Sequence, residues 1–198
     1  MTKSSQITLA CEILTVLKIA DPRSILAGGA VRDWRMLNAA GRDLDFYTSL
    51  PAYNGEAEIK EFITTSLRGT NIKLLGNKDL PENYSSMVGL KHVFEFERDG
   101  QLCNLMIMER GYLPQVAHNF DTSVCQASFD GDTYWYSDNF EVTLATGICF
   151  LHKDAKEDAK HVRKLADRFP TMRFVREVHV RPDPQADNFE DFQDDIPW

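Results

Sequence analysis

The chain has 198 residues, of which 43% are hydrophobic and 26% charged, and its formal net charge is −8. This length and composition indicate a single globular domain with a substantial core, and the lack of any apolar run near 18 to 20 residues argues against a membrane span. The negative charge argues against a protein built to grip a long stretch of nucleic acid, which would need a basic surface.

The N-terminal part of the sequence predicts helices alternating with short strands. Ser5 can cap a helix that continues to about residue 19, since apolar residues follow it at helical spacing. A short apolar strand over residues 24–27 then leads into Gly28 and Gly29. The elements predicted after these glycines are a helix over 30–37, a strand over 43–48, an amphipathic helix over 56–67 and a strand over 72–75.

The second half of the sequence predicts two hairpins. The dipeptide Asp99-Gly100 favours the positive φ angles of a tight turn, and Asp130-Gly131 marks the turn of a second hairpin. The remaining predicted elements are a loop over 77–86, hairpin strands over 91–97, 102–108, 123–129 and 133–136, a charged helix over 154–169 and a strand over 172–180.

The acidic residues are concentrated at the C-terminus. Residues 182–198 contain six acids and no Lys or Arg, so the rest of the chain carries only −2 of the total −8. We therefore predict a globular domain over residues 1–181 and an acidic, flexible tail over residues 182–198. The four cysteines are widely spaced and form no Cys-x-x-Cys pair, which favours reduced thiols in a cytoplasmic protein over disulfides or a zinc site.

The most informative stretch runs from Gly28 to Asp45. Two adjacent glycines at the start of a predicted helix offer backbone N–H groups to phosphate. Asp43 and Asp45 lie two residues apart on a predicted strand, so their side chains point to the same face and suit Mg²⁺ bound to a nucleoside triphosphate. The alternatives are a plain strand-to-helix turn and a solvated strand face with Arg42 as an ion-pair partner.

This stretch resembles the head-domain signature of the tRNA nucleotidyltransferase/poly(A) polymerase group, in the DNA polymerase β-like nucleotidyltransferase superfamily. The family pattern is Gly-Gly-x-Val-Arg-Asp, a short helix with a Gly-Arg turn, and then Asp-x-Asp; residues 28–33 and 41–45 match it. Fainter matches extend the resemblance to about residues 23–131, and nothing later resembles the family's neck, body or tail. The resemblance implies a small stand-alone head domain with an α+β fold, in which helices flank a central mixed sheet.

The resemblance also implies an activity. A member would transfer a nucleoside monophosphate from a nucleoside triphosphate to a hydroxyl acceptor and release pyrophosphate, with Asp43 and Asp45 as catalytic residues that hold two Mg²⁺ ions. The acceptor stays open between an RNA 3′ end such as that of tRNA, a protein and a small molecule. Small versions of this domain resemble phage-encoded and toxin-type enzymes, which implies the cytoplasm of a bacterial or phage-infected cell.

Further contacts to the nucleotide are expected from the matched residues. Gly28 and Gly29 would approach the triphosphate, Lys91 is a minor candidate for it, and Asp121 matches a position near the sugar. Two interpretations stay open for Arg32, which either reaches phosphate or the acceptor, or forms a buried pair with Asp33 or Asp45. Asp33 is expected to be an internal hydrogen-bonding group rather than a metal ligand.

Asn104 stands where the family often has a third carboxylate. Three explanations remain open. Another acid substitutes for it, two carboxylates suffice, or the site binds nucleotide and turns over poorly. The last explanation would make the chain a catalytically weak nucleotide-binding regulator, and a partner-binding protein on the same fold is a further alternative. The acids considered as substitutes are Glu95, Glu97, Glu109 and Asp121.

Overall fold

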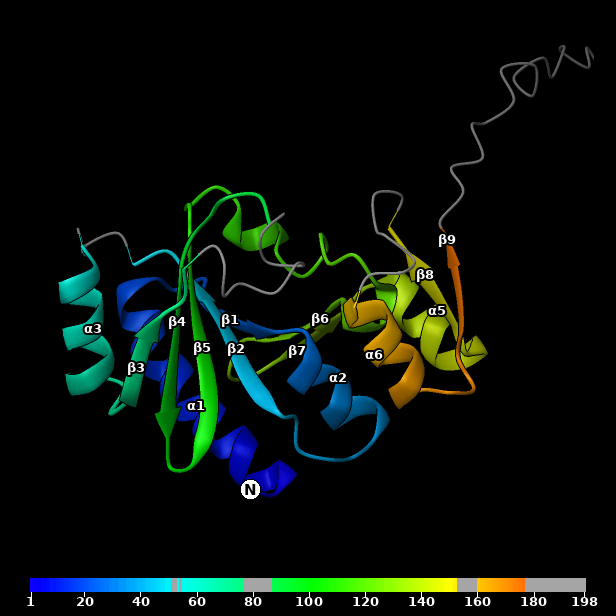
Figure 1. Ribbon diagram of the computed structural model, residues 1–198, viewed down its shortest axis with the longest axis horizontal. Helices are drawn as coiled ribbons and strands as arrows, with labels where there is room; N and C mark the ends of the chain where they lie inside the picture. Colours follow the sequence, from blue (N-terminus) through cyan, green and yellow to red (C-terminus); the bar gives the residue numbers. More distant parts are fainter. Residues whose placement is uncertain (51–52, 54, 77–86, 153–159, 177–198) are drawn as a thin grey trace, which may run out of the picture.

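A computed structural model of the chain describes residues 1–50, 53, 55–76, 87–152 and 160–176, and Figure 1 shows its architecture. A mixed sheet of seven strands, in the order β3-β4-β5-β2-β1-β6-β7, forms its centre, and β8 and β9 pair separately. The predicted α+β fold is thereby confirmed. The elements are α1 (Lys3–Ala20), β1 (Ile25–Ala27), α2 (Gly29–Met36), β2 (Asp43–Thr48), α3 (Glu56–Thr65), β3 (Thr70–Leu74), β4 (Leu90–Arg98), β5 (Gln101–Met108), the 3₁₀ turns Leu113–Gln115 and Ser123–Cys125, β6 (Ala127–Phe129), β7 (Tyr134–Tyr136), α5 (Asp138–Thr146), β8 (Ile148–Leu151), α6 (Lys160–Arg168) and β9 (Arg173–Arg176).

The main hydrophobic core lies between one face of the large sheet and the helices α1, α2 and α3. Ile13 and Leu17 of α1 are fully buried there, together with Trp34 of α2 and Phe46 of β2. In Figure 1, α1 lies behind the strands β4 and β5. None of the helices in the described ranges combines the length and the apolar character that crossing a bilayer requires.

The opposite face of the sheet is apolar toward the end of β2 and polar toward its start. Tyr47 and Met106 pack there with Leu113 and Val116, which belong to the segment that follows β5. Asp43 and Asp45 share this face with Tyr47, since alternate residues of a strand point the same way. The segment after β5 therefore covers the apolar half of this face, whereas the two acids lie on its polar half.

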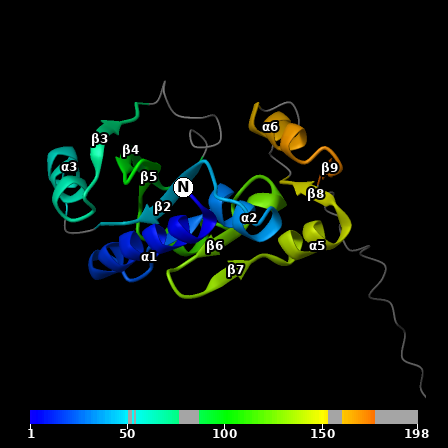
Figure 2. The ribbon, with the colours of Figure 1, turned by 90° about the horizontal axis from the view of Figure 1, so that it is seen from below.

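A smaller unit made of α5, β8, α6 and β9 lies beyond the β7 edge of the sheet, at the end of the molecule opposite α3 (Figures 1 and 2). The sequence analysis missed α5 and β8. The capping residues of α5 are of the usual types. Ser137 accepts a hydrogen bond from the Phe140 N–H as the N-cap of α5, and Gly147 ends the helix in the left-handed conformation with φ of 72°.

Two predicted elements differ from the structure. The N-cap of α1 is Thr2 rather than Ser5, because Thr2 accepts the Ser5 N–H and the Ser5 hydroxyl accepts the Thr2 N–H in return. Residues 123–125 form a 3₁₀ turn rather than a strand, since the Ser123 hydroxyl turns inward and accepts the Phe150 N–H at 2.8 Å. The predicted loop 77–86, the start of the predicted helix 154–169, the end of the predicted strand 172–180 and the tail 182–198 lie outside the described residues.

Candidate functional site

Strand pairing brings the glycine turn next to the two acids. β1 and β2 pair antiparallel, with Ile25 opposite Tyr47 and Leu26 opposite Phe46. Continuing that register places residue 27 opposite Asp45 and the glycine turn opposite the start of β2. Because paired strands lie about 4.8 Å apart, the two predicted halves of the site are direct neighbours.

The turn itself depends on Gly28. Its backbone has φ of 89° and ψ of −130°, a region that residues with side chains rarely adopt. The Gly28 N–H donates to the Ala127 carbonyl at 2.9 Å, and the Phe120 ring packs 3.5 Å from the position that a Cβ would take. The helix α2 begins at Gly29. The N–H groups of its first turn have no partner within the helix, so they are what this turn offers to an anion.

Asp43 and Asp45 are half-buried on the same face of β2, whereas Leu44 and Phe46 between and after them are buried on the other face. The Asp43 carboxylate accepts from Arg42, with distances of 2.6 Å to Nη2 and 3.1 Å to Nε. This is the ion pair of the alternative interpretation. The Arg42 side chain is 75% exposed, so water competes for the pair and a bound cation can replace it at little cost.

Asp45 contacts the residue that stands in place of a third carboxylate. The Asn104 Nδ2 donates to Asp45 Oδ1 at 2.8 Å, across the parallel pair of β2 and β5. Glu95 is opposite Asn104 on β4, two strand spacings or about 10 Å from Asp45, and it pairs with Lys73 at 3.3 Å. Within the described ranges, no group of three or more His, Cys, Asp or Glu side chains is placed to hold a metal.

The donor set nevertheless fits Mg²⁺. This ion is usually bound by one or two carboxylates together with phosphate oxygens and water. Asp43 and Asp45 supply two carboxylates on one face, beside a turn suited to phosphate. The hydrogen bond of Asn104 uses its nitrogen, so its Oδ1 is not consumed by that contact. Asp43 and Asp45 are therefore the residues that would hold the ion.

Arg32 and Asp33 form a buried pair, as in one of the two interpretations of Arg32, and Arg32 Nη2 also lies 3.7 Å from the position that a Cβ of Gly29 would take. Asp33 is 1% exposed and accepts from Arg32 Nε at 2.8 Å and from Arg168 Nη2 of α6 at 2.7 Å. The Arg32 guanidinium also contacts the Cys125 sulfur at 3.4 Å and lies 5.4 Å from the centre of the Phe169 ring. Asp33 therefore ties α6, through Arg168, to the helix that follows the glycine turn, and it is an internal hydrogen-bonding group.

The other two predicted contact residues are Lys91 and Asp121. Lys91 is exposed near the start of β4, whose first residue pairs with Met108, four residues or about 13 Å along β5 from Asn104. Asp121 Oδ1 lies 3.0 Å from His161 Nε2 of α6. The structure thus gathers the glycine turn, Asp43 and Asp45 at one place and sets Lys91 apart from them. Asp121 directly follows Phe120, whose ring packs beside Gly28.

Three of the four cysteines have thiols that are unfavourable as nucleophiles. All four are free thiols, as expected for reduced cysteines. Burial raises the pKa of Cys103 to about 12, and burial also raises the pKa of Cys149 and of Cys11 above the usual value. These three thiols are therefore protonated at neutral pH.

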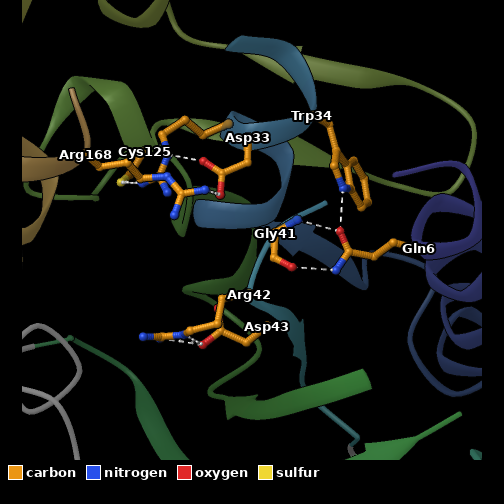
Figure 3. Close-up of polar contacts among 9 residues, drawn as sticks. Gln6, Asp33, Trp34, Gly41, Arg42, Asp43, Cys125 and Arg168 are labelled. Carbon is orange, nitrogen blue, oxygen red and sulfur yellow. Dashed lines mark hydrogen bonds and ion pairs between the residues drawn. The ribbon is translucent and has the colours of Figure 1, made fainter. Parts of the chain in front are cut away.

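The sequence analysis missed a polar network next to Asp43. Figure 3 shows Gln6 of α1 beside Trp34 and the turn at Gly41, just before Arg42 and Asp43. The signal that could have found it is a polar residue inside an apolar stripe, because Gln6 precedes Leu9 and Ile13 by three and seven residues on the same face of the helix. The sequence analysis also missed Arg168 as a partner of Asp33, and no comparable pattern in the sequence indicated it.

Solved structures with the same fold are found among CCA-adding and tRNA-processing enzymes. The chain is similar to a CCA-adding enzyme in complex with CTP (TM-score 0.53, 13% identity, 88% of this chain and 43% of that chain). It is also similar to a tRNA-processing enzyme complex and to a tRNA-processing enzyme with CTP (TM-scores 0.51 and 0.50, each with 16% identity, 81% of this chain and 43% of that chain). The chain thus spans less than half the length of these proteins.

No family model matches the sequence, and the comparison with curated proteins gives no match. The structural similarity to the CCA-adding enzyme covers 88% of this chain. The chain therefore has the nucleotidyltransferase fold of the CCA-adding and tRNA-processing enzymes.

Proposed function

We propose that this protein is a Mg²⁺-dependent nucleotidyltransferase that moves a nucleoside monophosphate from a nucleoside triphosphate to a hydroxyl acceptor. The observation that supports this most strongly is the β1–β2 register, which sets the glycine turn beside Asp43 and Asp45. The same fold occurs in a CCA-adding enzyme that was solved with CTP. An accessible carboxylate pair next to a helix N-terminus is the minimum equipment for this transfer.

Each group has a defined task in the proposed reaction. Asp43 and Asp45 would hold the two Mg²⁺ ions that the resemblance implies, and Gly28 gives the turn before α2 a backbone conformation that residues with side chains rarely adopt. The first-turn N–H groups of α2 bind the non-transferred phosphates. When bound, Mg²⁺ neutralises phosphate charge and makes the acceptor hydroxyl more acidic. Arg32 and Asp33 keep α2 in place through their buried ion pair.

The acceptor that we propose to test first is the 3′ end of an RNA such as tRNA, since the similar solved structures are tRNA-processing enzymes. Proteins and small molecules with hydroxyl groups are the alternatives. We place the reaction in the cytoplasm of a bacterial or phage-infected cell, in keeping with the free thiols.

Incubation of the full chain with Mg²⁺, each α-³²P-labelled triphosphate and tRNA should label the RNA and release pyrophosphate. A parallel thermal-shift series should show stabilisation by at least one triphosphate with Mg²⁺, by about 5 °C at a hundredfold excess over Kd. Binding without label transfer to RNA, protein extract or small molecules would reduce the proposal to nucleotide binding. A complete lack of triphosphate binding would overturn it.

One observation favours the second candidate, a nucleotide-binding protein with weak turnover. The Asn104 amide occupies one oxygen of Asp45 and adds no charge for a metal. If weak turnover is correct, Asn104→Asp should raise label transfer at least about tenfold, because a third carboxylate strengthens metal binding. If two carboxylates suffice, the same substitution should leave transfer unchanged or lower it, since the new charge would repel Asp45. Single-turnover label transfer by the two proteins separates these outcomes.

A further inference from the structure

The side chain of Gln6 is fully buried and fully bonded. Its Oε1 accepts from the Trp34 indole N–H and from the Gly41 N–H, each at 2.7 Å, and its Nε2 donates to the Gly41 carbonyl and to Gln101 Oε1, each at 2.9 Å. A carboxamide has two acceptor lone pairs and two N–H donors, so every one of its bonding positions is used. Figure 3 shows the carboxamide facing the Gly41 peptide.

Gln101 binds the backbone of the next residue, Arg42. It is buried at the start of β5, and its Nε2 donates to the Arg42 carbonyl at 3.0 Å. Gln6 binds both the N–H and the carbonyl of Gly41, and Gln101 binds the Arg42 carbonyl. These are the backbone groups just before Asp43. The start of β2 is therefore fixed by α1 and β5 as well as by its own strand pairing.

The turn at Gly41 also packs directly on α2. A Cβ at Gly41 would lie 2.7 Å from the Ala30 Cα and 2.9 Å from its Cβ, so glycine is required for this close approach. Ala30 follows Gly29 in the first turn of α2. Through Gly41, Gln6 thus sets the separation between the phosphate-facing end of α2 and the carboxylate of Asp43.

We propose that Gln6 is a positioning residue for the metal site, which rests on the proposed function. Mg²⁺ requires near-octahedral geometry at 2.0 to 2.1 Å from each oxygen, so a small displacement of Asp43 weakens its binding. An apolar residue at position 6 would fill the core without the cost of burying a carboxamide. The fully satisfied amide instead supplies a rigid attachment for the turn that carries Asp43.

The test measures binding of Mn²⁺ alone to the full chain, by EPR titration without nucleotide. Gln6→Met keeps the length of the side chain and removes the grip, and we expect about tenfold weaker Mn²⁺ binding. Gln101→Met should weaken binding in the same direction. Gln126→Met is the matched control, because the Gln126 amide also donates to two backbone carbonyls, at His118 and Phe120, but does not touch the turn before Asp43.

The outcomes separate a positioning role from a structural one. If Gln6 only supports the core, Gln6→Met and Gln126→Met should lower the melting temperature and leave Mn²⁺ affinity equal to that of the wild type, which would overturn the inference. If Gln6→Met does not fold, Gln101→Met decides, and unchanged affinity in that variant overturns the inference as well. A wild type that binds Mn²⁺ no better than Asp43→Asn would instead contradict the proposed function itself.

Discussion

Replacement of Asp45 by asparagine should reduce label transfer at least about a thousandfold while the fold stays intact. The loss follows from the loss of a metal ligand, whose stabilisation of transition-state charge is worth several kcal/mol at about 1.4 kcal/mol per tenfold in rate. The fold should survive, because the introduced carboxamide keeps an oxygen that can accept the Asn104 amide where the Asp45 carboxylate does now. Single-turnover transfer and far-UV circular dichroism measure the two effects.

Asp43→Asn should reduce label transfer for the same reason. Its fold should survive as well, because the contact that it loses is the ion pair with Arg42, whose side chain is 75% exposed. Asp99→Asn serves as the matched control. Asp99 is an exposed carboxylate at the tip of the β4–β5 hairpin with φ of 51°, a conformation that asparagine adopts readily. It should transfer label at the wild-type rate. A combined Asp43→Asn and Asp45→Asn protein that retains a tenth of wild-type transfer would show that these acids do not hold the metal.

The parts of the fold that depend on local pattern could be predicted from the sequence. The strand β2 has the predicted bounds, because the apolar residues Leu44 and Phe46 alternate with Asp43 and Asp45. The β4–β5 hairpin follows from Asp99-Gly100, whose two residues both have positive φ. The neighbourhood of the glycine turn and the acids followed from their order in the chain and from the family resemblance.

The rest of the site depends on contacts between distant residues. Gln6 lies 35 residues from Gly41 and 95 from Gln101 in sequence, and Arg168 lies 135 residues from Asp33. No local spacing pairs such residues, so their roles become visible only when the sheet is assembled. The missed helix α5 is a different case, since its capping signals at Ser137 and Gly147 were present in the sequence.

Substitution of Asp33 by asparagine should lower the free energy of unfolding by about 3 kcal/mol or more. The change leaves the Arg32 guanidinium buried, with 9% of its side chain exposed, and without a counter-charge on Asp33. For a domain of this size, that loss corresponds to a fall in Tm of about 6 to 12 °C. Equilibrium urea denaturation followed by circular dichroism gives the free energy directly.

A double-mutant cycle tests whether Arg32 is the partner that matters. Arg32→Met combined with Asp33→Asn should cost less than the sum of the two single changes, by about 2 kcal/mol, because each single change strands a buried group that the double change removes. Arg168→Gln is the control, since 40% of that side chain is exposed and its ion pair is screened by water; it should cost about 1 kcal/mol or less.

The same variants separate the support of α2 from the chemistry of the site. Asp33 is enclosed by two arginines and faces neither acid of β2 in any of its hydrogen bonds. Below its lowered melting temperature, the Asp33→Asn protein should therefore bind Mn²⁺ with wild-type affinity. Loss of Mn²⁺ binding in a folded Asp33→Asn protein would mean that Asp33 reaches the metal, and strictly additive energies in the cycle would mean that Arg168 rather than Arg32 holds this carboxylate. Wild-type Mn²⁺ affinity and non-additive energies together would show that the Arg32–Asp33 pair supports α2 without taking part in metal binding.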